Sequence, residues 1–136
     1  MTMQRPPVVT LCGSTRFKEE YLTAQRELTR EGIIILTVGE FGHADRTDAD
    51  SDTRLKERLD ELHLRKIDLS DAIVVINPGG YIGESTRREI AYARRAGKLV
   101  AFWMTYRLWS SRSWHICKPA SWLAAEFRVR VADTRP

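Results

Sequence analysis

The sequence predicts an α/β fold in which a parallel sheet of about 4–5 strands is covered by helices on both faces. Three observations predict it. Four short apolar runs are rich in β-branched residues, segments with helical periodicity lie between them, and most connections are short. Strands that alternate with helices in this way form parallel sheets. We therefore expect a Rossmann-like sheet of the flavodoxin-like kind.

The first half of the chain contains two predicted strands and one predicted helix. The strands are expected at residues 8–12 (VVTLC) and 33–38 (IIILTV). Between them, residues 16–32 place apolar side chains at helical spacing, namely Phe17, Tyr21, Ala24 and Leu28. The Ser14 or Thr15 hydroxyl can cap the start of this helix, and Gly32 can end it.

The second half repeats the alternation after a polar, acidic loop at residues 39–53. A helix is expected at roughly residues 53–69, with one apolar face formed by Leu55, Leu59, Leu62 and Leu69. A strand at residues 72–76, a helix that starts at residue 86 and ends at Gly97, and a strand at residues 99–103 should follow.

We expect residues 1–136 to form a single domain with a core at residues 8–103 and an aromatic-rich extension at residues 104–136. Trp103 and the tryptophans of the extension, Trp109, Trp114 and Trp122, lie at or beyond the last predicted strand. Such aromatic side chains pack onto a core or onto a partner subunit, and the sequence favours neither.

Composition and charge narrow the function classes. The net charge of +4 suits anionic ligands, but the basic residues are spread along the chain, so nucleic-acid binding is not expected. No apolar stretch approaches the roughly 18–20 residues of a membrane span, and the first residues lack the apolar segment of a signal peptide. Cys12 and Cys117 form no CxxC pair. We expect a cytoplasmic protein without a membrane partner.

Cofactor and metal motifs are missing from the sequence. It contains neither GxGxxG nor GxxxxGK[ST], which argues against dinucleotide-dependent and P-loop chemistry. The three histidines, His43, His63 and His115, show no zinc-binding spacing. We expect no cofactor and no metal.

Two segments should meet at the carboxyl ends of the strands, where open parallel sheets bind ligands. They are CGSTR at residues 12–16 and PGGYIGEST at residues 78–86. Each combines glycines, hydroxyl groups and a helix start whose free N–H groups favour an anion. Asp68 and Asp71 should lie at the opposite edge, whereas His63, about two turns earlier in its helix, can face the site.

These segments carry a resemblance to a known family. VTLCGSTR, DLSDAIVVIN and GGYIGESTRREIAYARRAGKLVAF resemble the nucleoside 2-deoxyribosyltransferase-like superfamily, which includes deoxynucleoside 5′-monophosphate N-glycosidases. The resemblance covers about residues 8–103. It implies that Glu89, in EIAYARRAGK, is the catalytic nucleophile and that Gly13 and Ser14 belong to the sugar- or phosphate-binding loop. It also implies a homodimer or a higher homo-oligomer.

A second, local resemblance involves LHLRK and SDAIVVINPGGYIGESTRRE, which are similar to the lonely guy phosphoribohydrolases. Both families cleave the N-glycosidic bond of nucleosides or nucleoside monophosphates. We therefore expect a nucleoside or nucleotide ligand and a glutamate nucleophile, with Tyr81 as a hydrogen-bonding partner of Glu89. The remaining expected substrate-binding residues are Cys12, Gly13, Ser14, Thr15, Arg16, His63, Gly79, Gly80, Gly83, Glu84, Ser85 and Thr86.

Two alternatives stay open from the sequence. Thr86 and Glu89 match a capping box, in which the glutamate closes its own helix start instead of facing a ligand. Thr10 and His63 stand where members of the family often have tyrosine and aspartate. These departures favour a non-catalytic nucleotide-binding domain of the same fold.

Overall fold

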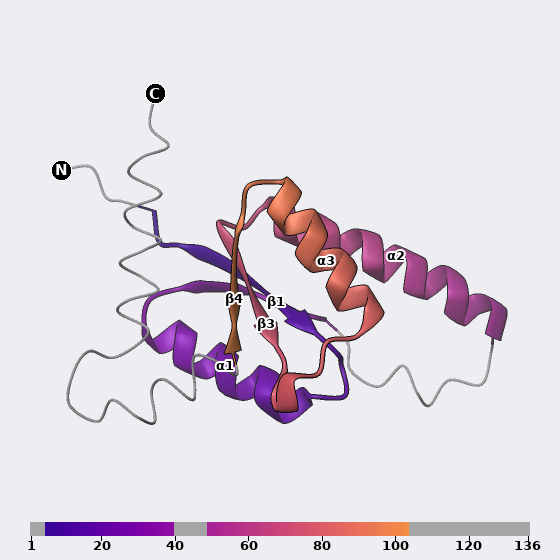
Figure 1. Cartoon of the computed structure of the whole chain (residues 1–136), viewed down its shortest axis with the longest axis horizontal. Coiled ribbons are helices and arrows are strands. Elements are labelled where there is room, and N and C mark those ends of the chain that lie inside the picture. Colours follow the sequence, from indigo (N-terminus) through magenta and orange to yellow (C-terminus); the bar gives the residue numbers. More distant parts are fainter. Residues whose placement is uncertain (1–4, 40–48, 104–136) are drawn as a thin grey trace.

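The computed structural model describes residues 5–39 and 49–103, which form four strands and three α-helices (Figure 1). The elements follow one another in the order β1 (Val8–Gly13), α1 (Lys18–Arg30), β2 (Ile34–Leu36), α2 (Ala49–Asp68), β3 (Ala72–Ile76), the short 3-10 helix η2 (Pro78–Gly80), α3 (Glu84–Arg95) and β4 (Leu99–Phe102). All strand pairs are parallel, in the order β2-β1-β3-β4. The predicted α/β, Rossmann-like sheet is confirmed, with four strands in the described residues.

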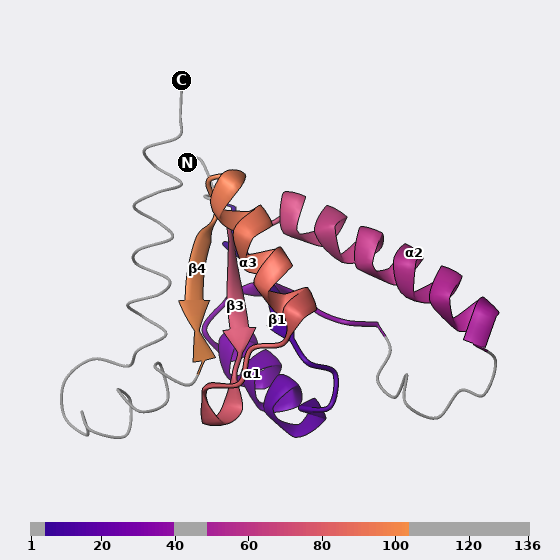
Figure 2. The same cartoon turned by 45° about the vertical axis from the view of Figure 1, so that its right-hand side comes forward.

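Helices cover both faces of the sheet, as predicted. Figures 1 and 2 show α1 on one face and α2 with α3 on the other. The core on the α1 side joins Tyr21, Ala24 and Leu28 to strand side chains and to the buried Trp103. The core on the opposite side joins Ile67 of α2 and Ile90 of α3 to β1 and β3. The central strands β1 and β3 therefore bury both faces, which explains their continuous apolar sequences.

The strand order places a topological switch point between β1 and β3. From β1 the chain runs to β2 on one side, and it then returns through α2 to β3 on the other side. The carboxyl ends of β1 and β3 lie side by side, with Gly13 opposite Ile76 in the register. Crevices at such points are where open α/β sheets bind ligands. The fold thus directs attention to the segments that follow these two strands.

Gly13 is required at the end of β1. Its φ is +148°, and a Cβ atom at this position would lie 2.6 Å from the Ile76 carbonyl oxygen. The Tyr21 hydroxyl donates a hydrogen bond of 2.8 Å to the Gly13 carbonyl oxygen. Gly13 therefore lets β1 end close against β3, and the Tyr21 hydrogen bond ties the same residue to α1.

The prediction of which side of the second helix is buried is wrong. The α2 positions buried against the sheet are His63 and Ile67, whereas Leu62 is 51% exposed and Leu69, beyond the helix end, is 71% exposed. Figures 1 and 2 show that only the C-terminal part of α2 approaches the sheet. The leucine periodicity therefore describes a helix surface that the sheet does not cover.

Several element boundaries also differ from the expectations. Helix α2 begins at Ala49, four residues before the expected start, and β2 spans only Ile34–Leu36. Neither Ser14 nor Thr15 caps α1, whose N-cap residue is Phe17 without a side-chain hydrogen bond. The expectations for residues 40–48 and 104–136 lie outside the described residues. Among the described helices, none is both long enough and apolar enough to cross a membrane.

Substituting alanine for Gly13 tests the close approach of β1 and β3. We expect Gly13→Ala to lower the free energy of unfolding by about 3 kcal/mol, because the new methyl group meets backbone and the left-handed φ is strained. Gly32→Ala is the matched control, since Gly32 also has a positive φ, +84°, but open space around its Cβ position. Urea unfolding measures both. Equal losses in the two variants would contradict the interpretation.

Candidate functional site

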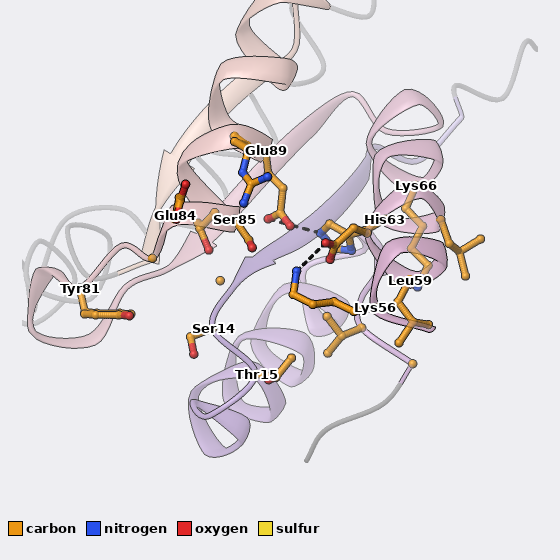
Figure 3. Close-up of a pocket in the computed structure, with 18 of the residues that line it drawn as sticks. Ser14, Thr15, Lys56, Leu59, His63, Lys66, Tyr81, Glu84, Ser85 and Glu89 are labelled. Atoms are coloured by element: carbon orange, nitrogen blue, oxygen red, sulfur yellow. Dashed lines mark hydrogen bonds and ion pairs between the residues drawn. The ribbon is translucent and has the colours of Figure 1, made fainter. Parts of the chain in front are cut away.

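A cleft of about 770 Å³ lies at the carboxyl edge of the sheet (Figure 3). Four segments form its walls: the β1–α1 loop, the chain after β2, one side of α2, and the β3–α3 loop with the start of α3. The lining residues are Gly13, Ser14, Thr15, Val38, Gly39, Thr53, Lys56, Leu59, Asp60, Leu62, His63, Lys66, Tyr81, Gly83, Glu84, Ser85, Thr86, Arg88 and Glu89. The size is typical of small-molecule sites.

Glu89 projects into this cleft from the second turn of α3. The helix begins at Glu84, and its N-cap residue is Gly83, with no side-chain cap. The capping box of Thr86 and Glu89 is therefore not formed. The side chain of Glu89 is only 16% exposed, and its buried Oε2 atom has no hydrogen-bond partner. A buried, unpaired carboxylate oxygen is costly for stability, which makes structural support an insufficient explanation of this residue.

His63 and Cys12 lie next to the Glu89 carboxylate. The His63 Nε2 atom is 3.8 Å from Glu89 Oε2 and 3.3 Å from the Cys12 sulfur. Figure 3 shows the Glu89 and His63 side chains pointing toward each other from α3 and α2. Cys12 is fully buried at the end of β1 and does not reach the cleft wall. Three polar side chains from three different elements thus meet here, with His63 and Glu89 at the floor of the cleft and Cys12 directly beneath it.

Burial changes the pKa of each member of this group in the direction that favours its uncharged form. Desolvation raises the pKa of Glu89 to about 7, while the Cys12 thiol, Lys56 and Arg88 offset part of the rise. Burial, with help from the positive charge of Lys66, lowers the pKa of His63 to about 4. Near neutral pH the imidazole is uncharged, so its approach to Glu89 is not an ion pair. Burial also raises the pKa of the Cys12 thiol, and a protonated thiol is a poor nucleophile.

The structure brings most of the predicted site residues to the cleft. Those that line it are Gly13, Ser14, Thr15, His63, Tyr81, Gly83, Glu84, Ser85, Thr86 and Glu89. Gly79 and Gly80 do not, because they form the exposed 3-10 turn η2 before the loop reaches the cleft. The backbone N–H groups of residues 84–86 precede the first intrahelical bond, from Arg87 to the Gly83 carbonyl, at 3.0 Å. Such free donors at a helix start favour an anion.

Arg16 stacks on aromatic rings instead of lining the cleft. Its guanidinium carbon lies 3.8 Å from the centre of the Tyr81 ring and 5.0 Å from that of Phe17. This cation–π stack joins the β1–α1 loop to the β3–α3 loop. Tyr81 and Glu89 lie well apart in Figure 3, so the phenol does not orient the carboxylate as expected.

Several residues of the cleft were missed by the sequence reasoning. Lys56 and Asp60 form an ion pair of 2.7 Å on α2, and the Lys66 ammonium group donates a 2.7 Å hydrogen bond to the Thr37 carbonyl. Lysine and aspartate four residues apart on a helix are common on solvated surfaces, so their spacing alone does not indicate a site. Only the position of α2 over the switch point brings these residues to the cleft.

Thr10, Asp68 and Asp71 have structural partners away from the cleft. The buried Thr10 hydroxyl donates to the Lys66 carbonyl oxygen at 3.1 Å and pairs with the Ser70 hydroxyl, which fixes the end of α2 on β1. Asp71 accepts hydrogen bonds from Arg5 and from the Val8 N–H group, and Asp68 accepts one from Tyr92. The expected exclusion of both aspartates from the cleft is confirmed.

No model of a known protein family matches the sequence, and no curated protein matches it either.

The buried carboxyl group of Glu89 predicts a pH-dependent effect of its substitution. The folded-state pKa of about 7 exceeds the reference value of 4.5, so the folded chain keeps a proton between these pH values that the unfolded chain loses. The free energy of unfolding therefore falls as pH rises through this window, by an amount on the order of 3 kcal/mol. The Glu89→Gln variant lacks this dependence.

As the pH rises from 4.5 to 8, we expect the free energy of unfolding of Glu89→Gln to increase relative to that of the wild type. His63 acts in the opposite direction, because stability from its neutral form is lost as pH falls from 6.5 toward 4, but it is present in both proteins. Urea unfolding at a series of pH values, with EDTA present, measures the difference. A difference that does not change with pH would show that Glu89 is not desolvated.

Proposed function

We propose that the chain is an N-glycosidase or deoxyribosyltransferase that cleaves the N-glycosidic bond of a nucleoside or a nucleoside 5′-monophosphate. The observation that carries the proposal is Glu89, a buried carboxylate with an unpaired oxygen in a cleft at the β1/β3 switch point. The sequence resemblance around Glu89 supports the same role.

The reaction needs a carboxylate that can approach an anomeric carbon from within a shielded pocket. A Glu89 oxygen attacks C1′, the C1′–N bond breaks, and its electron pair leaves with the base, which takes up a proton. Water then attacks C1′ of the glycosyl ester and restores the carboxylate; attack by a second base gives transfer instead.

The rest of the cleft suits a sugar and a phosphate. Ser14 of the β1–α1 loop and Ser85 of the first turn of α3 both line the cleft, where hydroxyl donors can bind sugar or phosphate oxygens. The free N–H groups at the start of α3 add donors for a 5′-phosphate. On the other wall, Leu59 and Leu62 of α2 present apolar surface on which a base can pack.

Homodimer formation and a cytoplasmic location are also part of the proposal, and both rest on the sequence alone. Analytical ultracentrifugation measures the first. A monomer at micromolar concentration would remove homodimer formation from the proposal.

Incubation with a panel of nucleosides and their 5′-monophosphates, followed by chromatography for free base, tests the activity. We expect the wild type to release base and Glu89→Gln to reduce kcat/KM by about 10³-fold, because the amide cannot attack C1′. Glu84→Gln should cost less, since Glu84 is an exposed residue of the first turn. Glu61→Gln, on α2 outside the cleft, is the control for removal of a surface carboxylate.

The same panel distinguishes the alternative of a non-catalytic nucleotide-binding domain. In that case no base is released or exchanged, and a nucleotide raises the melting temperature of both the wild type and Glu89→Gln.

Ser85→Ala tests where a 5′-phosphate binds. We expect kcat/KM for a nucleoside 5′-monophosphate to fall about tenfold, the effect of losing one hydrogen bond to a charged group, with little change for the matching nucleoside. The nucleoside is the internal control, because it shares the sugar and the base. Equal losses for both substrates would place Ser85 against the sugar and the phosphate elsewhere.

A further inference from the structure

We propose that Cys12, His63 and Glu89 form a Zn²⁺-binding site at the floor of the cleft. The three residues come from β1, α2 and α3, and their sulfur, nitrogen and oxygen ligand atoms all lie within 4.8 Å of one another. Because they are far apart in the sequence, no histidine or cysteine spacing indicates the site. The fold alone assembles it.

Two of the three distances between the ligand atoms are close to those of a tetrahedral zinc centre, and the third is below 4.8 Å. With Zn–S near 2.3 Å and Zn–N and Zn–O near 2.1 Å, neighbouring ligand atoms are about 3.4–3.6 Å apart. The Cys12 sulfur lies 3.3 Å from His63 Nε2, which lies 3.8 Å from Glu89 Oε2. Side-chain shifts of a few tenths of an ångström would bring these two distances to the ideal values.

The chemistry of the ligand atoms selects zinc over the common hard cations. Mg²⁺ and Ca²⁺ bind oxygen ligands, whereas a thiolate and an imidazole favour Zn²⁺ and other late transition-metal ions. A metal ion binds the uncharged imidazole and the thiolate. Binding of the ion releases the proton of the Cys12 thiol.

The Cys12 sulfur and the His63 imidazole form a hydrogen bond of 3.3 Å, but this contact leaves an oxygen of Glu89 unmatched. Cys12 belongs to an otherwise apolar cluster with Ile73, Val75 and Ile67, and the Glu89 oxygen nearest to His63 has no hydrogen-bond partner. Burying three polar groups beside such a cluster costs stability unless something compensates for the lost water. A bound cation supplies that compensation.

A zinc ion at this position also has a consequence for catalysis, and this consequence rests on the proposed function. His63 and Glu89 line the cleft, so the fourth coordination position of the ion is reached from it. When the Glu89 carboxylate coordinates the ion, it is no longer available to attack C1′. Zn²⁺ is therefore expected to be a reversible inhibitor of base release.

Cobalt substitution tests the site without any activity measurement. The full chain is treated with EDTA, freed of the chelator and titrated with Co²⁺, whose bond to a thiolate gives a charge-transfer absorption band in the near ultraviolet. We expect this band at one ion per chain in the wild type, and its loss when Zn²⁺ is added. Isothermal titration with Zn²⁺ gives the affinity, which should fall at least about 100-fold in His63→Gln and in Glu89→Gln.

The second cysteine of the chain provides the matched control. Cys117→Ser should keep the Co²⁺–thiolate band, whereas Cys12→Ser should lose it. Circular dichroism establishes that each variant is folded; if Cys12→Ser is not, the wild type and Cys117→Ser still decide. Absence of the band in the wild type, or its loss in Cys117→Ser, would overturn the site.

Base release in the presence of Zn²⁺ separates the two proposals. Inhibition that EDTA reverses supports both. A Co²⁺–thiolate band in a protein that releases no base under any condition keeps the metal site and overturns the glycosidase. Base release that continues at saturating Zn²⁺ overturns the coordination of the ion by Glu89.

Discussion

The close approach of β1 and β3 at their carboxyl ends is the constraint on which the candidate site depends. Gly13 packs so tightly against the Ile76 carbonyl that only a glycine fits, and the Tyr21 hydroxyl fixes the same peptide. Because the two strands end side by side, their following loops leave the sheet in one place. Ser14 and Ser85 reach the same cleft for this reason, although they lie far apart in the sequence.

The placement of α2 decides what chemistry the cleft contains. Thr10 and Ser70 join the end of this helix to β1, so that the helix lies over the switch point. His63 then occupies a position that an apolar side chain would fill if the helix served only the core. Its neutral imidazole, the protonated Cys12 thiol and the Glu89 carboxylate meet where water is largely excluded. Electrostatic interactions with a ligand or a metal ion are stronger in such surroundings, because the local dielectric constant is low.

The sequence predicts the fold well and the site in part, for reasons that particular residues make clear. The strand at Ala72–Ile76 is continuous, apolar and bounded by polar residues, and its expected bounds are those observed. The leucines of α2 mislead, because periodicity reports which residues share a face but not which part of a long helix meets the sheet. Arg16 is assigned to the ligand because it belongs to the CGSTR segment, yet it stacks on Tyr81, a contact between two loops that local sequence does not encode.

Glu89 shows why a motif needs its surroundings before it can be interpreted. From the sequence, the capping box competes with a functional role. The structure removes the capping box, since α3 starts at Glu84 and Glu89 is already in the second turn. A glutamate at that point could extend into water, and it instead keeps one oxygen buried without a partner. That arrangement raises the pKa of Glu89 to about 7, so the buried carboxylate lowers the stability of the fold near neutral pH. A ligand that contacts the oxygen, whether an anomeric carbon or a metal ion, would offset this cost.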